Sequence, residues 1–390
     1  MISKSPPRTA APPILGRQMV MLLVAAFGAL CGFYLLLSVV PLYAADSGGG
    51  EYGAGLATGA TMLSTVLIEL AVPRLLARLG YRAVMGLGLL LLGAPAIALV
   101  ASPATVLVLG VSLVRGAGLG IVVVVGSALA AELVPPRRRA EGLALYGVVV
   151  CVPAIVGLPA GIWLSEHVGF APVFVAAAAV ALLPLAAVPA LPARSGGEVR
   201  PGSVLDAFRA GGLARPAVIF TAVTFAAGVF ATFLPLAVPA ETRGVAAVAL
   251  LVQALTMSAA RFAAGRFGDR HGSGPLLIPA VLASAAGAAL LMWVDSPLAM
   301  IAGMALFGAG FGAAQNVTLT LMIERVGAAE YGRTSALWNV AYDAGFGIGA
   351  VGFGLVVGPV GYVTGFVLTA AVLLTALVPA ILDRRKADLD

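Results

Sequence analysis

The sequence contains the same pattern twice, at an offset of 192 residues. Sliding the chain along itself by this distance brings glycines, prolines and charges into register, without a gap, over about residues 69–174. The glycine-rich segment Gly116–Gly120 then falls on Gly308–Gly312, and Gly157 falls on Gly349. Because the offset is close to half of the 390 residues, we expect two related halves built on one plan.

Composition indicates that both halves lie in a membrane. Hydrophobic residues make up 61% of the chain and charged residues only 10%, with a mean hydropathy of +1.06, whereas soluble domains carry about 25% charged residues. A spanning helix needs about 20 apolar residues, so the chain has room for about twelve such helices. Apolar runs between charges and Gly/Pro breaks predict an all-α polytopic membrane fold with twelve transmembrane helices, six in each pseudo-symmetric half, at residues 18–43, 54–73, 83–101, 104–130, 141–164, 170–191, 216–240, 245–264, 275–294, 297–322, 334–357 and 361–382.

The basic residues predict how the chain is oriented. Of the 23 Lys and Arg residues, 20 lie in one alternating set of segments that includes both ends of the chain. Positively charged loops stay on the cytoplasmic side, so we expect both termini in the cytoplasm and the spans in a bacterial inner (plasma) membrane. The net charge of +6 then reflects topology, and nucleic-acid binding is not expected. The expected parts are a cytoplasmic tail at 1–17, an N-terminal half at 18–191, a cytoplasmic linker at 192–215 with a short surface helix near 204–209, a C-terminal half at 216–382 and a second tail at 383–390.

The connection between the eighth and ninth predicted helices carries a distinctive motif, Gly265-Arg-Phe-Gly-Asp269-Arg270-His-Gly272. Glycines permit the tight turn, and Asp and Arg can interact with helix ends or lipid head groups. With twelve helices in two halves, the motif resembles the signature loop of the major facilitator superfamily, which latches the cytoplasmic side in the outward-open state. The resemblance covers nearly the whole chain and implies transport by alternating access, with two halves rocking around a central site. It also implies a gating role for Gly265, Asp269, Arg270 and Gly272.

The first copy of this motif, 192 residues earlier, is degraded. Arg78 and Gly80 match, but Ala77 stands where the acidic residue would be. We expect an asymmetric latch in which the second copy carries more of the lock; the alternative is that both segments simply make tight turns. Glu69 and Arg261 are equivalent residues of the two halves, 192 positions apart. Each lies a few residues inside the predicted cytoplasmic end of its helix, where long side chains can reach the membrane surface. Both are expected to act in gating rather than in substrate binding.

The fifth predicted helix is rich in glycine and proline. Its residues Gly147, Pro153, Gly157, Pro159 and Gly161 resemble the Gly/Pro-rich motif of drug–proton antiporters in the same family, although the order of glycines and prolines is looser here. Small residues let helices approach closely, and a proline lets a helix bend. The motif therefore favours export, and ordinary close packing of helices is the alternative.

Two charged residues lie deep inside predicted spans. Arg115 and Asp343 are each about 15 Å from a membrane face, at 1.5 Å of rise per residue, and a charge at that depth costs about 2.5–3.5 kcal/mol and normally has a use. Asp343 lies in Trp338–Gly349, which resembles the same segment of bacterial efflux carriers, and it is our candidate proton carrier; a structural hydrogen bond or ion pair is the alternative. Arg115 has three candidate roles, namely proton coupling, contact with an anionic substrate group and structural pairing. The arginine position usual in the family holds Ser112 here, which puts coupling through Arg115 in doubt.

The resemblance implies a cavity lined mainly by the first, fourth, seventh and tenth helices. These spans carry aromatic and weakly polar stripes, although such stripes in a bilayer are more often packing than pocket. Together they favour an amphiphilic organic molecule over a phosphate or a densely hydroxylated sugar, which would need several charges or many polar partners. The expected substrate-binding residues are Tyr34, Ser38, Arg115, Thr221, Phe225, Phe311, Gln315 and Asn316.

These features predict a secondary active transporter, a proton-coupled exporter (antiporter) of a small amphiphilic compound such as a drug, natural product, siderophore or sugar-like metabolite. Uptake by symport or uniport is the alternative. A non-transporting receptor or membrane enzyme is disfavoured because the sequence has no metal or nucleophile constellation. Cys31 and Cys151 lie in separate apolar spans and suggest neither a disulfide nor a metal site. We expect no cofactor, and a monomer whose partners are the lipid bilayer, a small organic substrate and protons.

Overall fold

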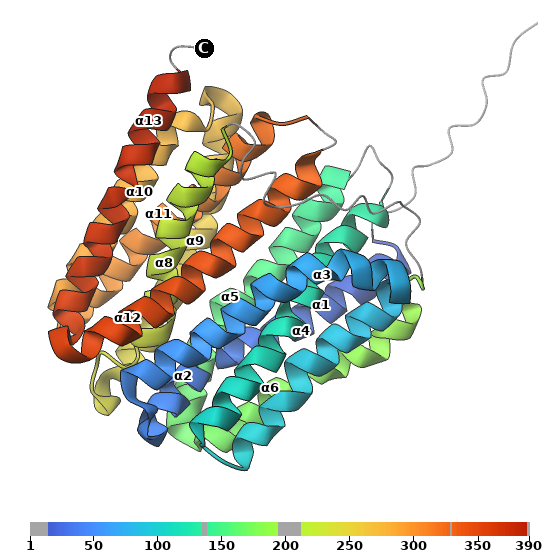
Figure 1. Ribbon diagram of the computed structural model, residues 1–390, viewed down its shortest axis with the longest axis horizontal. Helices are drawn as coiled ribbons and strands as arrows, with labels where there is room; N and C mark the ends of the chain where they lie inside the picture. Colours follow the sequence, from blue (N-terminus) through green and yellow to red (C-terminus); the bar gives the residue numbers. More distant parts are fainter. Residues whose placement is uncertain (1–14, 135–138, 194–211, 328–329, 388–390) are drawn as a thin grey trace, which may run out of the picture.

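The computed structural model describes residues 15–134, 139–193, 212–327 and 330–387, and the regular elements in these ranges are helices (Figure 1). The surface helix expected near 204–209 lies outside the described residues. The α-helices are α1 (Arg17–Leu37), α2 (Val39–Ala44), α3 (Gly50–Gly93), α4 (Thr105–Glu132), α5 (Arg139–Val168), α6 (Phe170–Leu182), α8 (Ala214–Phe233), α9 (Arg243–His271), α10 (Leu277–Leu290), α11 (Pro297–Glu324), α12 (Tyr331–Thr375) and α13 (Leu377–Ala387).

The described residues form twelve membrane spans, as the sequence predicts. Nine helical stretches are long and apolar enough to cross a bilayer, and two of them are far longer than one span: Arg17–Val100 has 84 residues and Tyr331–Arg384 has 54. The first is broken by non-helical backbone at Gly48 and at Gly80, and the second at Gly361. Each break reverses the chain at a membrane face, so these two stretches contribute three spans and two spans. The all-helical architecture with two six-helix halves is confirmed.

The backbone itself repeats at the 192-residue offset. Gly80 and Gly272 have φ of +76° and +79°, and Gly169 and Gly361 have φ of +82° and +78°. Residues with a side chain rarely adopt these angles, so the reversals between paired spans depend on glycine. Equivalent turns of the two halves are therefore made by equivalent residues with nearly the same conformation.

Close helix contacts repeat in the same way. A Cβ atom at Gly116 of α4 would overlap the carbonyl oxygen of Thr61, and a Cβ at Gly308 of α11 would overlap that of Gln253, which is the residue 192 positions after Thr61. Small residues at such contacts let backbones approach without bulky side chains between them, which is how helices pack in a bilayer. The repeated glycines thus set the spacing of helices within each half.

Two helix ends differ from the sequence expectation. The span predicted at 54–73 continues as helix to Leu79, and the span predicted at 245–264 continues to His271. Gly265, Asp269 and Arg270 are therefore in the last turns of α9 rather than in a loop. Charged residues end an apolar run in the sequence, but a helix can extend past the hydrocarbon core into water, where its charges are hydrated.

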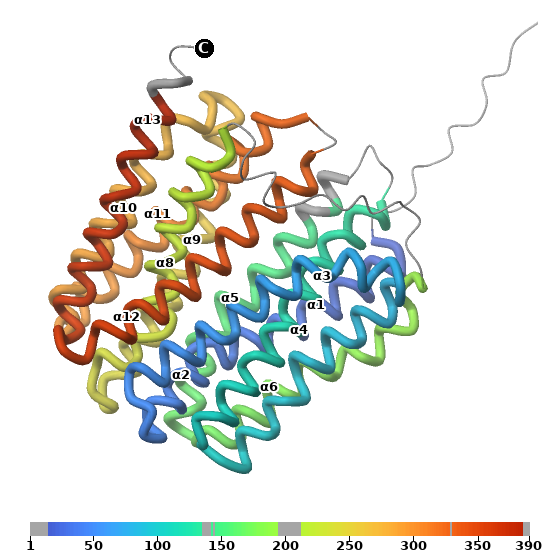
Figure 2. The backbone as a smooth tube through the Cα atoms, in the orientation of Figure 1, coloured from blue at the N-terminus to red at the C-terminus, as the bar shows by residue number. Residues whose placement is uncertain are grey.

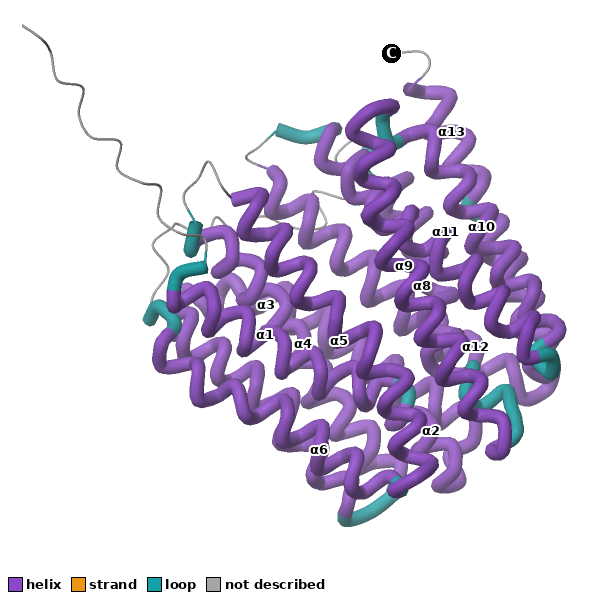
Figure 3. The backbone as a smooth tube through the Cα atoms, turned by 180° about the vertical axis from the view of Figure 1, so that it is seen from behind, coloured by secondary structure: helices purple, strands orange, loops and turns teal. Residues whose placement is uncertain are grey.

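The two halves meet at one face of the membrane domain. We call the face at which the described chain starts and ends the termini side, and the opposite face, with the turns at Gly48, Gly169 and Gly361, the far side. In Figures 2 and 3 the halves lie against each other on the far side and draw apart toward the termini side. Polar contacts between the halves on the far side join Ser38 Oγ to the Ala231 carbonyl (2.6 Å), Thr58 Oγ1 to Thr232 Oγ1 (2.9 Å), Tyr362 Oη to Glu51 Oε1 (3.4 Å) and Arg243 Nη2 to Asp46 Oδ1 (3.6 Å).

Residues of α9 are buried in its far-side part and more exposed in its termini-side part. Several residues between Ala246 and Ala254 are buried, whereas Ala264 is the only buried residue from Leu255 to the end of the helix. Because α9 packs against α5 of the N-terminal half, this loss of burial agrees with the separation of the halves toward the termini side that Figures 2 and 3 show. The described conformation is closed on the far side and open on the termini side.

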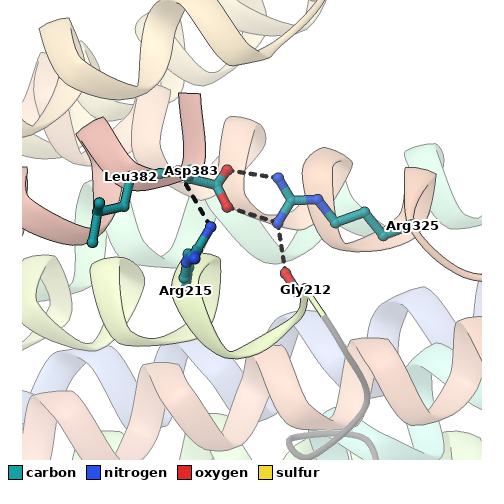
Figure 4. Close-up of polar contacts among 5 residues, drawn as sticks. All are labelled: Gly212, Arg215, Arg325, Leu382 and Asp383. Carbon is teal, nitrogen blue, oxygen red and sulfur yellow. Dashed lines mark hydrogen bonds and ion pairs between the residues drawn. The ribbon is translucent and has the colours of Figure 1, made fainter. Parts of the chain in front are cut away.

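An arginine fastens three helices of the C-terminal half at the termini side (Figure 4). Arg325, at the end of α11, makes two hydrogen bonds with the carboxylate of Asp383 in α13, at 3.0 and 2.6 Å, and a third with the Gly212 carbonyl just before α8. Arg215 of α8 donates to the Leu382 carbonyl. In the N-terminal half, Arg82 donates two hydrogen bonds to the carbonyl of Leu191, which is the repeat equivalent of Asp383.

Candidate functional site

Polar and titratable side chains from both halves converge at mid-membrane depth. Tyr34 of α1 interacts electrostatically with Cys151 of α5, Arg261 of α9 and Asp343 of α12. Tyr342 of α12 interacts with all four of these residues. These five residues, which we call the central cluster, come from four helices and from both halves of the chain. A polar cluster of this kind inside a membrane indicates a functional site.

Asp343 is buried in this cluster and has a second carboxyl group beside it. Its side chain is 8% exposed, and it interacts electrostatically with Glu69 of α3, which is 9% exposed. Oε1 of Glu69 is buried without a hydrogen-bond partner. The sequence led us to expect a Glu69 side chain that reaches the membrane surface, whereas the structure buries its carboxyl group among neighbouring helices.

Arg261 reaches the cluster with the help of a glutamine. Its Nη1 donates to Oε1 of Gln315 in α11 at 3.2 Å, and Nε2 of Gln315 donates to the sulfur of Met257 at 3.4 Å. Gln315 is 4% exposed, while Arg261 is half-buried. The sequence predicted Arg261 as a gating residue and Gln315 as a substrate contact, and the structure brings the two together at one place.

Two repeat-related pairs surround the centre. Asp343 is the repeat equivalent of Cys151, and Arg261 is the repeat equivalent of Glu69. Equivalent residues of two halves can approach one point only near the pseudo-two-fold axis that relates those halves. Sequence reasoning did not name Cys151 or Tyr342 as site residues. The repeat offered a signal for Cys151, since it occupies the position of a deep carboxylate, but none for Tyr342.

Arg115 lies away from the central cluster, inside the N-terminal half. Its Nε donates to the Leu92 carbonyl at 3.2 Å and its Nη2 donates to the Gly32 carbonyl at 3.3 Å, and the side chain is 4% exposed. Beyond Gly93 the third span turns into a 3₁₀ helix that contains Pro95, which has no N–H, so carbonyls of the preceding turn lose their α-helical donors. Of the three candidate roles, this geometry favours the structural one.

We expect Arg115→Lys to lower thermal stability and to leave transport per folded molecule intact. A lysine ammonium cannot reproduce the fork that bridges two carbonyls on different helices, and a hydrogen bond to a charged group contributes about 2 kcal/mol. Thermal unfolding of the purified protein in detergent, paired with a vesicle transport assay, measures both effects. Arg74→Lys, at an exposed position, is the control. Lost proton coupling at unchanged stability would contradict the structural role.

The remaining predicted substrate contacts occupy different environments. Ser38 lies in the far-side contact between the halves, and Thr221 donates to backbone carbonyls of Ala217 and Ala341. Asn316 lies next to Gly265 of α9. Phe225 is half-buried on α8. Tyr34 and Gln315 are therefore the predicted contacts that lie at the centre.

Phe311 belongs to an aromatic chain through the C-terminal half. It is 2% exposed and stacks on Phe307 and on Tyr342, with ring centroids 5.7 and 6.1 Å apart. The chain continues through Trp338 and Phe220, which stack at 4.5 Å. Phe311 thus supports Tyr342 from behind, so that one wall of the central cluster is rigid and aromatic.

The charged residues of both motif copies are exposed on the termini side. Arg78, Asp269 and Arg270 are exposed, while Gly80 and Gly272 form the turns. This arrangement fits a latch that is disengaged while the termini side is open.

A groove of about 800 Å³ lies elsewhere, on the outer surface between α1, α5 and α6. Its lining is apolar, from Val20, Val24 and Phe27 to Val180 and Leu183. It holds no polar group that could orient a substrate, and its position suits contact with lipid chains. We place the functional site at the central cluster because the charged and hydrogen-bonding groups gather there.

Twelve spans in two repeat-related halves, enclosing an intramembrane polar cluster and open to one face only, define a membrane transporter that moves small substrates by alternating access. The chain belongs to the Major Facilitator Superfamily, whose sequence profile matches residues 22–250 and again residues 217–389. Membership places it among secondary transporters and not among enzymes.

Solved structures of other transporters share this fold. The nucleoside transporter NupG superposes with a TM-score of 0.76 at 13% identity, covering 94% of this chain and 99% of its own. A D-xylose–proton symporter gives 0.76 at 14% identity, with 93% and 96% covered. An inward-facing, occupied bacterial homologue of the human lysosomal transporter Spinster gives 0.74 at 14% identity, with 96% and 98% covered. Among curated proteins, none matches the sequence.

Proposed function

We propose that this transporter uses a proton gradient to export a small amphiphilic organic compound, with Asp343 as the proton carrier. The observation that carries the proposal is the position of Asp343, which is buried at the boundary between the halves. Among the residues that the structure describes, no arginine or lysine forms an ion pair with it. A carboxyl group that is not held as an anion by a fixed cation can alternate between neutral and charged forms, as a proton carrier must.

The fifth span supports the direction of transport. Gly157 packs against Tyr34, and Gly161 packs against Leu35 of α1, so that side chains at either glycine would overlap the first span. The Gly/Pro motif that resembles drug–proton antiporters therefore sits at a close contact next to the central cluster. The aromatic wall beside polar groups suits an amphiphilic compound.

The proposed orientation puts the termini side in the cytoplasm of a bacterial cell. The predicted halves, 18–191 and 216–382, then rock about the centre while the linker at 192–215 joins them. Closure of the termini side engages a latch formed by the predicted gating residues Arg78, Gly80, Gly265, Asp269, Arg270 and Gly272, with Glu69 and Arg261 deeper in the boundary.

Proton-coupled uptake is the second candidate. A buried carboxyl group at the centre serves a symporter as well as an antiporter, and one structural relative is by name a D-xylose–proton symporter. That likeness, at 14% identity, concerns the fold. The two candidates predict opposite signs of substrate movement for the same imposed pH gradient.

Metabolite profiling of cells with and without the gene, followed by transport in everted vesicles, tests the proposal. For an exporter, the compound that accumulates in cells lacking the gene enters everted vesicles when their interior is acidified, and a protonophore abolishes the entry. Depletion of the compound from cells lacking the gene would instead establish uptake. Entry that ignores the pH gradient would overturn proton coupling.

A further inference from the structure

Glu69 stands beside the proposed proton carrier on the opposite half of the molecule. We propose that Glu69 and Asp343 share one proton across the boundary between the halves, and that the empty transporter cannot close its termini side while both carboxyl groups are unprotonated. The inference rests on the proposed function, since it assumes that Asp343 carries a proton. It adds a second carboxyl group to the proton site and assigns the pair a step in the conformational cycle.

The packing of α3 against α12 sets the level of the two carboxyl groups. These helices run antiparallel, with Gly347 against Met62 and Gly55 against Ala350. Asp343 lies four residues before Gly347 in α12. Because the helices are antiparallel and Gly347 contacts Met62, Asp343 lies at the same height along the helix axis as Val66, four residues after Met62 in α3. Glu69 is three residues further along, about 4.5 Å nearer the termini side.

The surroundings of the pair give neither carboxyl a fixed counter-charge. Glu69 is more than nine-tenths buried, and its Oε1 has no hydrogen-bond partner. The titratable groups that interact with Asp343 are Glu69 from α3, Tyr34 from α1 and Tyr342 from α12, and the two tyrosines interact in turn with Cys151 from α5 and Arg261 from α9. Arg261 is engaged with Gln315 instead of either carboxyl. A proton on one oxygen would satisfy both groups, because a neutral carboxyl donates a hydrogen bond that a carboxylate accepts.

Closure changes the distance between these groups. The halves touch on the far side and are apart on the termini side, so rocking must bring the termini-side parts of α3 and α12 together. Glu69 lies on that side of Asp343 and approaches α12 as the gap narrows. Two carboxylates in a poorly solvated boundary repel each other and oppose this approach, whereas one proton held between them removes the repulsion. The repeat-equivalent boundary between α5 and α9 carries Cys151 and Arg261 in place of the two carboxyl groups. Repulsion between carboxylates therefore opposes closure at the boundary between α3 and α12 and not at this one.

Distance measurements between the halves test the proposal. Spin labels carried by unnatural amino acids at Leu79 and His271, which are exposed repeat-equivalent positions on the termini side, report closure and leave the native thiols Cys31 and Cys151 in place. With native carboxyls, we expect acidification to shift the population toward the shorter distance. Glu69→Gln should show the shorter distance at alkaline pH and lose the response, because the amide donates to Asp343 without a proton. Glu241→Gln, on the exposed far side, is the control and should respond to pH as the parent does.

Proton counting separates this inference from the proposed function. The purified parent should take up one proton per molecule on closure, and Glu69→Gln should take up none. Glu69→Asp keeps a carboxyl group, is the less disruptive variant and should retain the response to pH. If Glu69→Gln keeps the parent's response while Asp343→Asn abolishes driven transport, the shared proton is wrong and the proposed function stands. If Asp343→Asn still transports substrate uphill, the shared proton and the proposed role of Asp343 as proton carrier are both wrong.

Discussion

Asp343→Asn is expected to reduce gradient-driven transport to the level of empty vesicles while sparing downhill exchange. Asparagine has nearly the same size and can hydrogen-bond, but it neither binds nor releases a proton in the physiological range. The transport cycle would therefore continue to move substrate between equal concentrations without gaining work from the pH gradient. The effect is large because the carboxyl group is buried at the boundary between the halves, where it can face each side in turn.

Vesicles with an imposed pH gradient measure the first half of this result, and counterflow of labelled substrate without a gradient measures the second. Asp343→Glu, which restores a titratable carboxyl, should recover part of the driven transport. Asp295→Asn changes an exposed acid on the far side and serves as the matched control. Uphill transport at the parent rate in Asp343→Asn would remove this residue from the coupling mechanism.

Gly349→Leu is expected to destabilise the fold strongly. A Cβ atom at this position of α12 would overlap the carbonyl oxygen and Cα of Phe225 in α8, and a backbone contact cannot relax as a flexible side chain could. Overpacking of this kind costs about 1–3 kcal/mol, which corresponds to a fall of about 5 °C in Tm. The leucine also pushes apart two helices that carry the wall of the central cluster, so activity should fall with stability.

Thermal unfolding in detergent measures the change, and the same helix offers a matched control. Gly358 is exposed on α12, and a Cβ atom at this position would have no neighbouring atom within 4 Å, so Gly358→Leu should leave Tm nearly unchanged. Equal Tm values for the two leucine variants would show that the contact between α12 and α8 is looser than described.

Length, hydropathy and the internal repeat were sufficient to predict the fold. Each apolar run is long enough to cross a bilayer once, and the repeat required the same reversals in both halves, as Gly80 and Gly272 show. The predicted ends of the second and eighth spans were too early because the hydropathy of the sequence falls where charges begin, while the helix itself continues into water.

The composition of the central cluster was less accessible from sequence. The sequence places Asp343 and Arg115 at similar depth in their spans. In the structure Asp343 lies at the boundary between the halves, whereas Arg115 donates hydrogen bonds to carbonyls within the N-terminal half. The difference depends on how each helix is rotated and on the helical irregularity near Pro95, which are properties of packing between distant segments. Tyr342 reaches the centre for the same reason, because its rotation on α12 is set by contacts with Phe311.

The arginine that joins α8, α11 and α13 has a mechanical consequence. Arg82 fixes the chain at Leu191, shortly before it leaves the N-terminal half, and Arg325 fixes it again at Gly212, as it enters the C-terminal half. Each half therefore holds its own end of the connection through an arginine, and the described polar contacts between the halves are those across their boundary on the far side.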